Sequence, residues 1–171
     1  GQEQTCIGSN VILTPNVQGG YWTSSDTSIA KINNSGIVHA LHSGTITLSY
    51  FFQNGECLFQ ANHPLIIHSK PDIQFVGETT LCEGESTFLT PSSGGFWMSS
   101  NPAVATISLQ GNVITHQAGT ATFSYVLYFT GCQSEPSQIL TVHALPKTEL
   151  TGEASICEES VTTVGPTTNG T

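Results

Sequence analysis

The five cysteines are the side chains of this sequence with the most chemistry open to them: Cys6, Cys57, Cys82, Cys132 and Cys157. Thiols form disulfides, hold metal ions or act as nucleophiles, depending on their neighbours and their compartment. In an acidic chain of only 171 residues, this number of cysteines indicates an oxidising compartment and disulfide bonding. We therefore expect a secreted protein or one displayed on the cell surface.

Other reactive residues give no catalytic or metal-binding pattern. Only two of the six histidines, His68 and His143, recur at equivalent places, each before a proline, and we expect them to be structural. No histidine has a cysteine or aspartate partner at zinc-ligand spacing. Aspartate occurs only as Asp26 and Asp72, so we expect no calcium site at a domain junction. The sequence predicts no enzyme, no catalytic residue, no metal and no cofactor.

Charge and hydropathy exclude two classes of partner. The chain has three lysines, no arginine and twelve carboxylates, and its formal charge is −9. Such a surface repels phosphate backbones, so we expect no nucleic-acid binding. No run approaches the ~18 apolar residues that a membrane span needs, so we expect no membrane insertion.

These cysteines belong to a repeat that recurs every 75 residues. Gly19-Gly20-Tyr21-Trp22 corresponds to Gly94-Gly95-Phe96-Trp97, and many positions downstream match at the same offset. A third copy begins near Pro146 and ends just before its tryptophan would come. The repeat predicts three domains: residues 1–70, residues 71–145, and the truncated start of a third at 146–171. We interpret the chain as a window on a longer array.

Alternation and turn residues predict seven short strands in each complete unit. In the second unit we expect them at 73–82 (interrupted at Gly77), 86–90, 96–99, 104–108, 113–116, 120–129 and 138–144. No segment has a helical period. Seven strands with one tryptophan on the third predict an all-β fold of tandem immunoglobulin-like β-sandwiches. Trp22 and Trp97 are then interpreted as the core pins of their units.

The segments around each tryptophan resemble the bacterial immunoglobulin-like group 2 repeat (BIG2). In the second unit the resemblance rests on residues 97–107, Gly111-Asn112-Val113 and 118–123, and the first unit repeats the pattern. It covers both complete units and implies surface display and adhesion or spacing. The contexts Cys82-Glu83-Gly84 and Gly131-Cys132 are similar to repeats of large Bacteroidota surface adhesins, including gliding-motility adhesins exported by the type 9 secretion system. The resemblance supplies no catalytic residue.

Two disulfide pairings are open on this fold. Pairing within each unit joins Cys6 to Cys57 and Cys82 to Cys132. In such a sandwich, however, these cysteines lie in turns at opposite poles, about 30 Å apart along the long strand, whereas a disulfide needs Cα atoms within ~7 Å. Pairing between units joins Cys6 to Cys132 and is favoured. Cys57, Cys82 and Cys157 would then pair with units outside the window.

The predicted function is a structural or adhesive segment of a repetitive bacterial surface adhesin or filament. It would act as a stiff multi-domain stalk for surface attachment, including gliding. Neighbouring immunoglobulin-like repeats of the same chain are the expected partners, and surface polysaccharide is a candidate ligand. Two alternatives remain: an accessory module of a secreted polysaccharide-degrading enzyme, and a subunit of an extracellular fibre.

Overall fold

The computed structural model describes residues 2–146, 150–151 and 165–166, and every regular element among them is a β-strand. The strands form two separate groups of sheets, each around its own hydrophobic core. The predicted all-β sandwich fold is confirmed. We call strands β1–β7 the first sandwich and strands β8–β16 the second sandwich. Most of the predicted third unit lies outside the described residues.

The first sandwich contains β1 (Gln4–Cys6), β2 (Asn10–Ile12), β3 (Tyr21–Ser24), β4 (Ala30–Ile32), β5 (Ile37–Ala40), β6 (Gly44–Asn54) and β7 (Cys57–His68). One sheet has the order β1-β7-β6-β3 and the other β2-β5-β4. Side chains alternate along β6, so that Ile46, Leu48 and Tyr50 are buried while Thr45 and Thr47 are exposed. This alternation turns the apolar face of β6 toward the opposite sheet.

The second sandwich contains β8 (Gln74–Phe75), β9 (Thr80–Cys82), β10 (Ser86–Thr90), β11 (Gly95–Ser99), β12 (Ala105–Ile107), β13 (Asn112–Thr115), β14 (Gly119–Ala121), β15 (Phe123–Leu127) and β16 (Leu140–His143). Its strands are ordered β12-β13-β10-β8, β11-β15 and β14-β16-β9. The predicted interruption at Gly77 separates β8, which pairs with β10, from β9, which pairs with β16. The first predicted strand therefore crosses from one sheet to the other.

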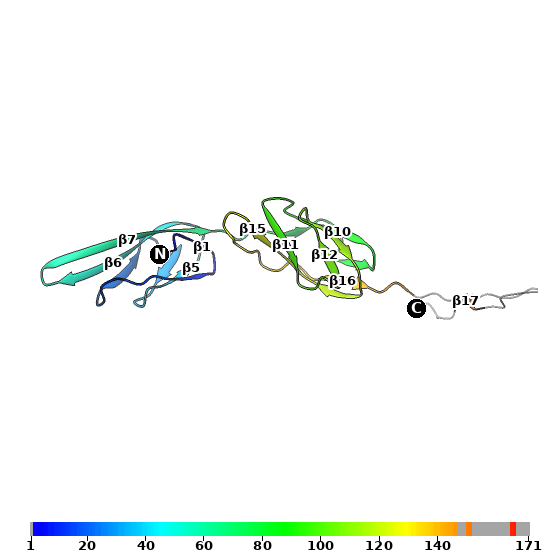
Figure 1. Ribbon diagram of the computed structural model, residues 1–171, viewed down its shortest axis with the longest axis horizontal. Coiled ribbons are helices and arrows are strands. Elements are labelled where there is room, and N and C mark those ends of the chain that lie inside the picture. The colour runs from blue at the N-terminus through cyan, green and yellow to red at the C-terminus, as the bar shows by residue number, and fades with distance from the viewer. Residues whose placement is uncertain (1, 147–149, 152–164, 167–171) are drawn as a thin grey trace, which may run out of the picture.

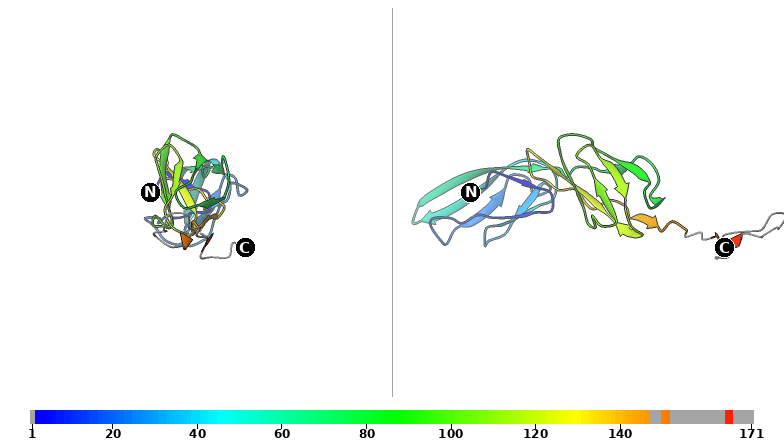
Figure 2. Two further views of the ribbon diagram at one scale, coloured as in Figure 1. Left: turned by 90° about the vertical axis from the view of Figure 1, so that its right-hand side faces the viewer. Right: turned by 45° about the vertical axis from the view of Figure 1, so that its right-hand side comes forward.

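The two sandwiches lie end to end in an elongated molecule (Figure 1). A turned view shows the same arrangement (Figure 2). Beyond the second sandwich the structure describes one further pair of short strands, β17 (Leu150–Thr151) and β18 (Gly165–Pro166), which are antiparallel to each other. The chain passes between the sandwiches through the few residues that separate β7 from β8.

The sequence predicted one long strand at 120–129, and this prediction was wrong, because the structure has two strands there, β14 and β15. Its counterpart β6 pairs with β7 in one continuous register, in which Phe51 lies opposite Gln60. In the second sandwich Val126 lies opposite Gln133, two residues earlier than the counterpart of Gln60, Glu135. The ladder is therefore shifted between β16 and the hairpin tip.

Serine hydroxyls support this shifted segment. The backbone N–H groups of Tyr125 and Phe123 donate to the Oγ atoms of Ser134 and Ser137, at 3.0 and 2.9 Å. Pro136 lies between the two serines and has no N–H to offer a ladder. The first sandwich has Phe59, Ala61 and Asn62 at the corresponding places, and its hairpin stays straight.

Candidate functional site

A disulfide joins the two sandwiches. Cys6 and Cys132 are bonded across 126 positions of sequence, with their Cα atoms 5.6 Å apart. This is the pairing between units that the sequence analysis favoured over pairing within a unit. Cys132 has no exposed surface, whereas Cys6 is partly exposed.

Strand order explains why these two cysteines meet. Cys6 ends β1, which runs parallel to β7 with Cys6 opposite His68, where the chain leaves the first sandwich. Cys132 follows the hairpin turn after β15, and the Leu127 N–H donates to its carbonyl at 3.0 Å. The end of one sandwich therefore presents its cysteine to the beginning of the next.

An ion pair crosses the same junction. The Lys70 ammonium group donates to a carboxylate oxygen of Glu135, and both side chains are partly exposed to solvent. Exposed pairs of this kind contribute roughly 0–1 kcal/mol. The disulfide, and not this pair, is therefore the main connection across the junction besides the chain itself.

The remaining cysteines fall into two groups. Among the described residues, Cys57 and Cys82 are unpaired; Cys57 is exposed at the hairpin tip and Cys82 is partly exposed at the end of β9. Cys82 is the counterpart of Cys6, because it lies opposite His143 as Cys6 lies opposite His68. Cys157, for which an outside partner was predicted, lies outside the described residues.

The two tryptophans differ in their surroundings. Trp97 is buried, donates from its indole N–H to the Pro91 carbonyl at 3.1 Å, and belongs to the second core. Trp22 packs against the first core but is only partly buried. Each ring is tilted against a tyrosine, Tyr50 or Tyr125, with ring centroids 4.8 Å apart. The role of core pin fits Trp97 better than Trp22.

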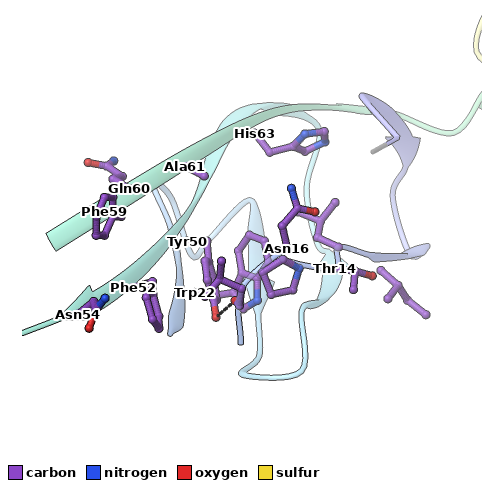
Figure 3. A pocket seen from close by; sticks show the side chains of 14 residues that line it. Thr14, Asn16, Trp22, Tyr50, Phe52, Asn54, Phe59, Gln60, Ala61 and His63 are labelled. Atoms are coloured by element: carbon purple, nitrogen blue, oxygen red, sulfur yellow. Dashed lines mark hydrogen bonds between the residues drawn. The ribbon is translucent and has the colours of Figure 1, made fainter. Parts of the chain in front are cut away.

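The exposed part of Trp22 opens into a groove of the first sandwich (Figure 3). The groove has a volume of about 750 Å³ and lies between the segment after β2 and the facing part of the β6–β7 hairpin. Its lining includes Trp22, Tyr50, Phe52 and Phe59, and it contains no charged side chain. Volume and composition lie in the range of small-molecule and peptide sites.

The groove has a polar rim made of neutral groups. Asn16, Asn54, Gln60 and His63 line it, and the Tyr50 hydroxyl donates to the Val17 carbonyl at 2.9 Å. The sequence analysis did not predict this groove. The available signals were weak: Phe52 and Phe59 face each other across the hairpin, and the second unit has Leu127 and Ser134 at those places.

Histidines and carboxylates add no second site in the described part of the chain. Five imidazoles hydrogen-bond to oxygen atoms of the protein: His39, His42, His63, His68 and His116. The same residues include no cluster of three His, Cys, Asp or Glu side chains that could hold a metal. They also include no helix long and apolar enough to cross a membrane.

Two ionisable groups have shifted pKa values. Hydrogen bonds from the side chain and backbone of Ser28 lower the pKa of Asp26, which is exposed in a turn. Burial raises the pKa of Tyr125, whose ring lies in the core of the second sandwich. Neither group lies in the groove, and both shifts follow from local structure.

Comparisons with known proteins give no family. No protein-family model and no curated protein matches the chain. Among solved structures, the surface-layer protein SbsC (domains 1–6) is 14% identical, with a TM-score of 0.29, over 79% of this chain and 21% of that one. This chain thus spans about a fifth of that structure.

Two further solved structures are also similar. Human protocadherin-24 EC1-2 is 11% identical, with a TM-score of 0.31, over 84% of this chain and 94% of that one. The four N-terminal immunoglobulin domains of Dscam1 isoform 4.44 are 8% identical, with a TM-score of 0.33, over 87% and 52%. Superpositions at this level carry no argument about what the chain does.

Proposed function

We propose that this chain is a structural or adhesive segment of an extracellular surface protein, in which tandem sandwiches form a stiff spacer. The observation that supports the proposal is the Cys6–Cys132 disulfide between the sandwiches. A disulfide persists in an oxidising compartment, which supports an extracellular location. The proposal includes no enzymatic activity, because the sequence motifs on which it rests supply no catalytic residue.

Two covalent connections make the junction stiff. The chain itself passes from β7 to β8, and the disulfide makes a second connection through a different pair of turns. A single linker leaves two domains free to bend and twist, which is the usual expectation for small interfaces. The disulfide starts beside the linker, because Cys6 lies opposite His68, and it limits how far the second sandwich can move from the end of the first. The Lys70–Glu135 pair adds a third contact.

The more specific assignment rests on sequence motifs. The tryptophan and glycine pattern supports membership of the BIG2-like repeats, and the cysteine contexts support the gliding-type adhesins of Bacteroidota that the type 9 system exports. In this proposal neighbouring repeats are the structural partners of each unit, and surface polysaccharide is the candidate ligand of the array. The repetition would supply avidity if single units bind weakly.

Small-angle X-ray scattering of the monomeric chain tests the stiffness of the junction. We expect the oxidised chain to give a narrow distance distribution with the maximum of an end-to-end arrangement. Cys132→Ser should broaden that distribution and lower its mean, because only the linker then holds the sandwiches. Cys57→Ser is the matched control, since it removes an exposed cysteine outside the junction, and should leave the distribution unchanged.

Equal distributions for the Cys132→Ser variant and the parent chain would contradict the stiff-spacer proposal. Surface location needs a separate measurement. An antibody against the folded chain should label intact cells of the source organism without permeabilisation. Labelling that appears only after the cells are opened would refute the extracellular assignment, whatever the scattering shows.

A further inference from the structure

The larger sheet of the first sandwich has a solvent-facing side opposite its core. The alternation that buries one side of β6 turns Ser49 and Phe51 to the other side. Residues directly opposite each other in an antiparallel sheet share a face. Two rows of residues therefore cross β3, β6 and β7 on this side, and we call them the outer face: Tyr21, Phe51 and Gln60, and next to them Thr23, Ser49 and Asn62.

The first row holds an open aromatic ring. The rings of Tyr21 and Phe51 are stacked, with centroids 5.3 Å apart and planes 19° from parallel. Tyr21 belongs to β3, which is the last strand of its sheet, and it is 53% exposed. Phe51 thus supports one side of the Tyr21 ring while much of the ring meets solvent. A tyrosine held in this way offers apolar contact area at a small cost in conformational entropy.

The neighbouring polar side chains are held together by hydrogen bonds. The Oδ1 atom of Asn62 accepts from Ser49 Oγ at 2.9 Å and from Gln60 Nε2 at 2.8 Å. Within the described residues, no bond uses the Asn62 NH₂ group or the Gln60 carbonyl oxygen, and both side chains are exposed. The outer face therefore presents donors and an acceptor beside the aromatic ring.

Charge restricts the class of ligand. All six residues of the outer face are neutral, in a chain whose formal charge is −9. A cationic ligand finds no counter-charge on this face, and the chain as a whole repels an anionic one. A neutral sugar chain fits, because its rings combine apolar C–H faces with hydroxyls that donate and accept. The two rows are about 7 Å apart and the three strands span about 10 Å, so the surface suits an extended chain.

The second sandwich has the same combination of groups, made by different residues. The Phe96 ring lies 6.0 Å from that of Tyr128, and Gln133 Nε2 donates to Ser124 Oγ at 3.0 Å. Tyr128 is 59% exposed, although the first sandwich is bonded to this end of the second through Cys132. A neighbouring sandwich therefore leaves this side of the sheet accessible.

We propose that the outer face binds a neutral, extended polysaccharide. One sugar ring stacks on Tyr21, and its hydroxyls exchange hydrogen bonds with the amides of Gln60 and Asn62. A single small site of this kind has a Kd of about a millimolar, and repetition along an array raises the avidity. The inference rests on the proposed adhesive function and deepens it, because it names the binding surface and the class of ligand.

NMR titration of the whole oxidised chain tests the site. The probes are cellohexaose, xylohexaose and chitohexaose, which are neutral and extended. At least one of them should shift the side-chain amide signals of Gln60 and Asn62 and the backbone amide of Tyr21. Hexagalacturonic acid is the charged control, and it should shift these signals less at the same concentration.

Substitutions at Tyr21 separate the ring from the rest of the surface. Tyr21→Ala should weaken binding at least about tenfold, because the stacked apolar area is lost. Tyr21→Phe keeps the ring and should bind within about threefold of the parent chain. Leu109→Ala, which removes an exposed apolar side chain from the second sandwich, should leave binding unchanged. The backbone amide spectrum of each variant shows whether it is folded.

Each other outcome would overturn the proposal. These outcomes are no shift with any neutral probe at about 10 mM, undiminished binding by a folded Tyr21→Ala variant, and equal binding of hexagalacturonic acid. Broadening of the outer-face signals with protein concentration, in the absence of sugar, would instead assign the face to a second copy of the chain. None of these results changes the scattering test of the spacer or the labelling test of surface location, so the two proposals fail separately.

Discussion

At the scale of single residues, equivalent positions of the two repeats differ in burial and in bonding. Cys132 is fully buried in a disulfide while its counterpart Cys57 is exposed and unpaired. Trp97 is enclosed while Trp22 opens to solvent. Sequence similarity between repeats therefore identifies which residues correspond, and their neighbours decide what each of them does.

The tryptophans give a direct test of this difference. Trp97→Ala should destabilise the second sandwich by about 3–5 kcal/mol, since it empties a well-packed core position and removes an aromatic pair. Trp22→Ala should cost the first sandwich clearly less, because part of the ring is already exposed. Chemical denaturation followed by circular dichroism measures both. Equal losses would contradict the difference in packing.

Alkaline pH should act on the second sandwich through Tyr125. Burial raises its pKa above the usual value of 10.0, so the unfolded chain loses this proton at a lower pH than the folded one. The stability that results is complete below about pH 10 and is lost as the pH rises through the folded pKa. The denaturation midpoint of the parent chain should therefore fall as the pH rises from 9 to 11. The midpoint of the Tyr125→Phe variant should fall less steeply over the same range.

The exposed Tyr21 of the first sandwich is the control for that experiment, since it does not act on Tyr125. Tyr21→Phe should keep the pH dependence of the parent chain. A parallel fall for the parent and for Tyr125→Phe would show that other groups cause it.

At the scale of elements, the two long hairpins are the main difference between the sandwiches. One is a straight ladder from Gly44 to His68, and the other shifts by two residues and buries Cys132 and Ser134. The shift keeps Cys132 opposite Leu127, whereas Cys57 lies opposite Asn54 at the tip. The hairpin that carries the disulfide between the sandwiches is thus the one with the shifted register.

Ser134 should be important for that shifted hairpin. Its Oγ accepts from the buried Tyr125 N–H, so Ser134→Ala leaves this donor without a partner. An unsatisfied buried donor costs about 1–3 kcal/mol. Asn62→Ala, in the exposed face of the straight hairpin, should change stability by about 0.5 kcal/mol or less. Urea denaturation of each variant compares the two, and a neutral Ser134→Ala would contradict the role of the hydroxyl.

Many of the strand positions could be predicted from the sequence. Glycine, proline and alternation located the strand at 86–90 with the bounds that β10 has, and the break at Gly77. The division of the strand predicted at 120–129 could not be read, because it depends on Ser134, Ser137 and Pro136 in a segment that follows it. The groove was missed for a related reason: it forms where residues 12–17 face the β6–β7 hairpin, and no local motif records that contact.

At the scale of the whole molecule, the order of the sandwiches and the disulfide between them were accessible from the repeat. Cysteines placed at opposite poles of a unit cannot reach each other, and this geometric argument favoured Cys6–Cys132, the bond that the structure contains. The Lys70–Glu135 pair could not be predicted, since Leu145 and Gln60 occupy the corresponding places and the repeat gives no hint of it.

The disulfide also decides how a pulling force travels along the chain. Tension applied on either side of the two cysteines passes directly from Cys6 to Cys132, and the residues between them carry no load. Fully stretched, those 126 positions would add about 430 Å of length. In single-molecule pulling, the oxidised chain should therefore release only β1 and the strands after Cys132. The reduced chain should lengthen by roughly that much more. A surface protein built from such units would keep a nearly constant end-to-end length under shear. It would lengthen wherever one of these disulfides is reduced.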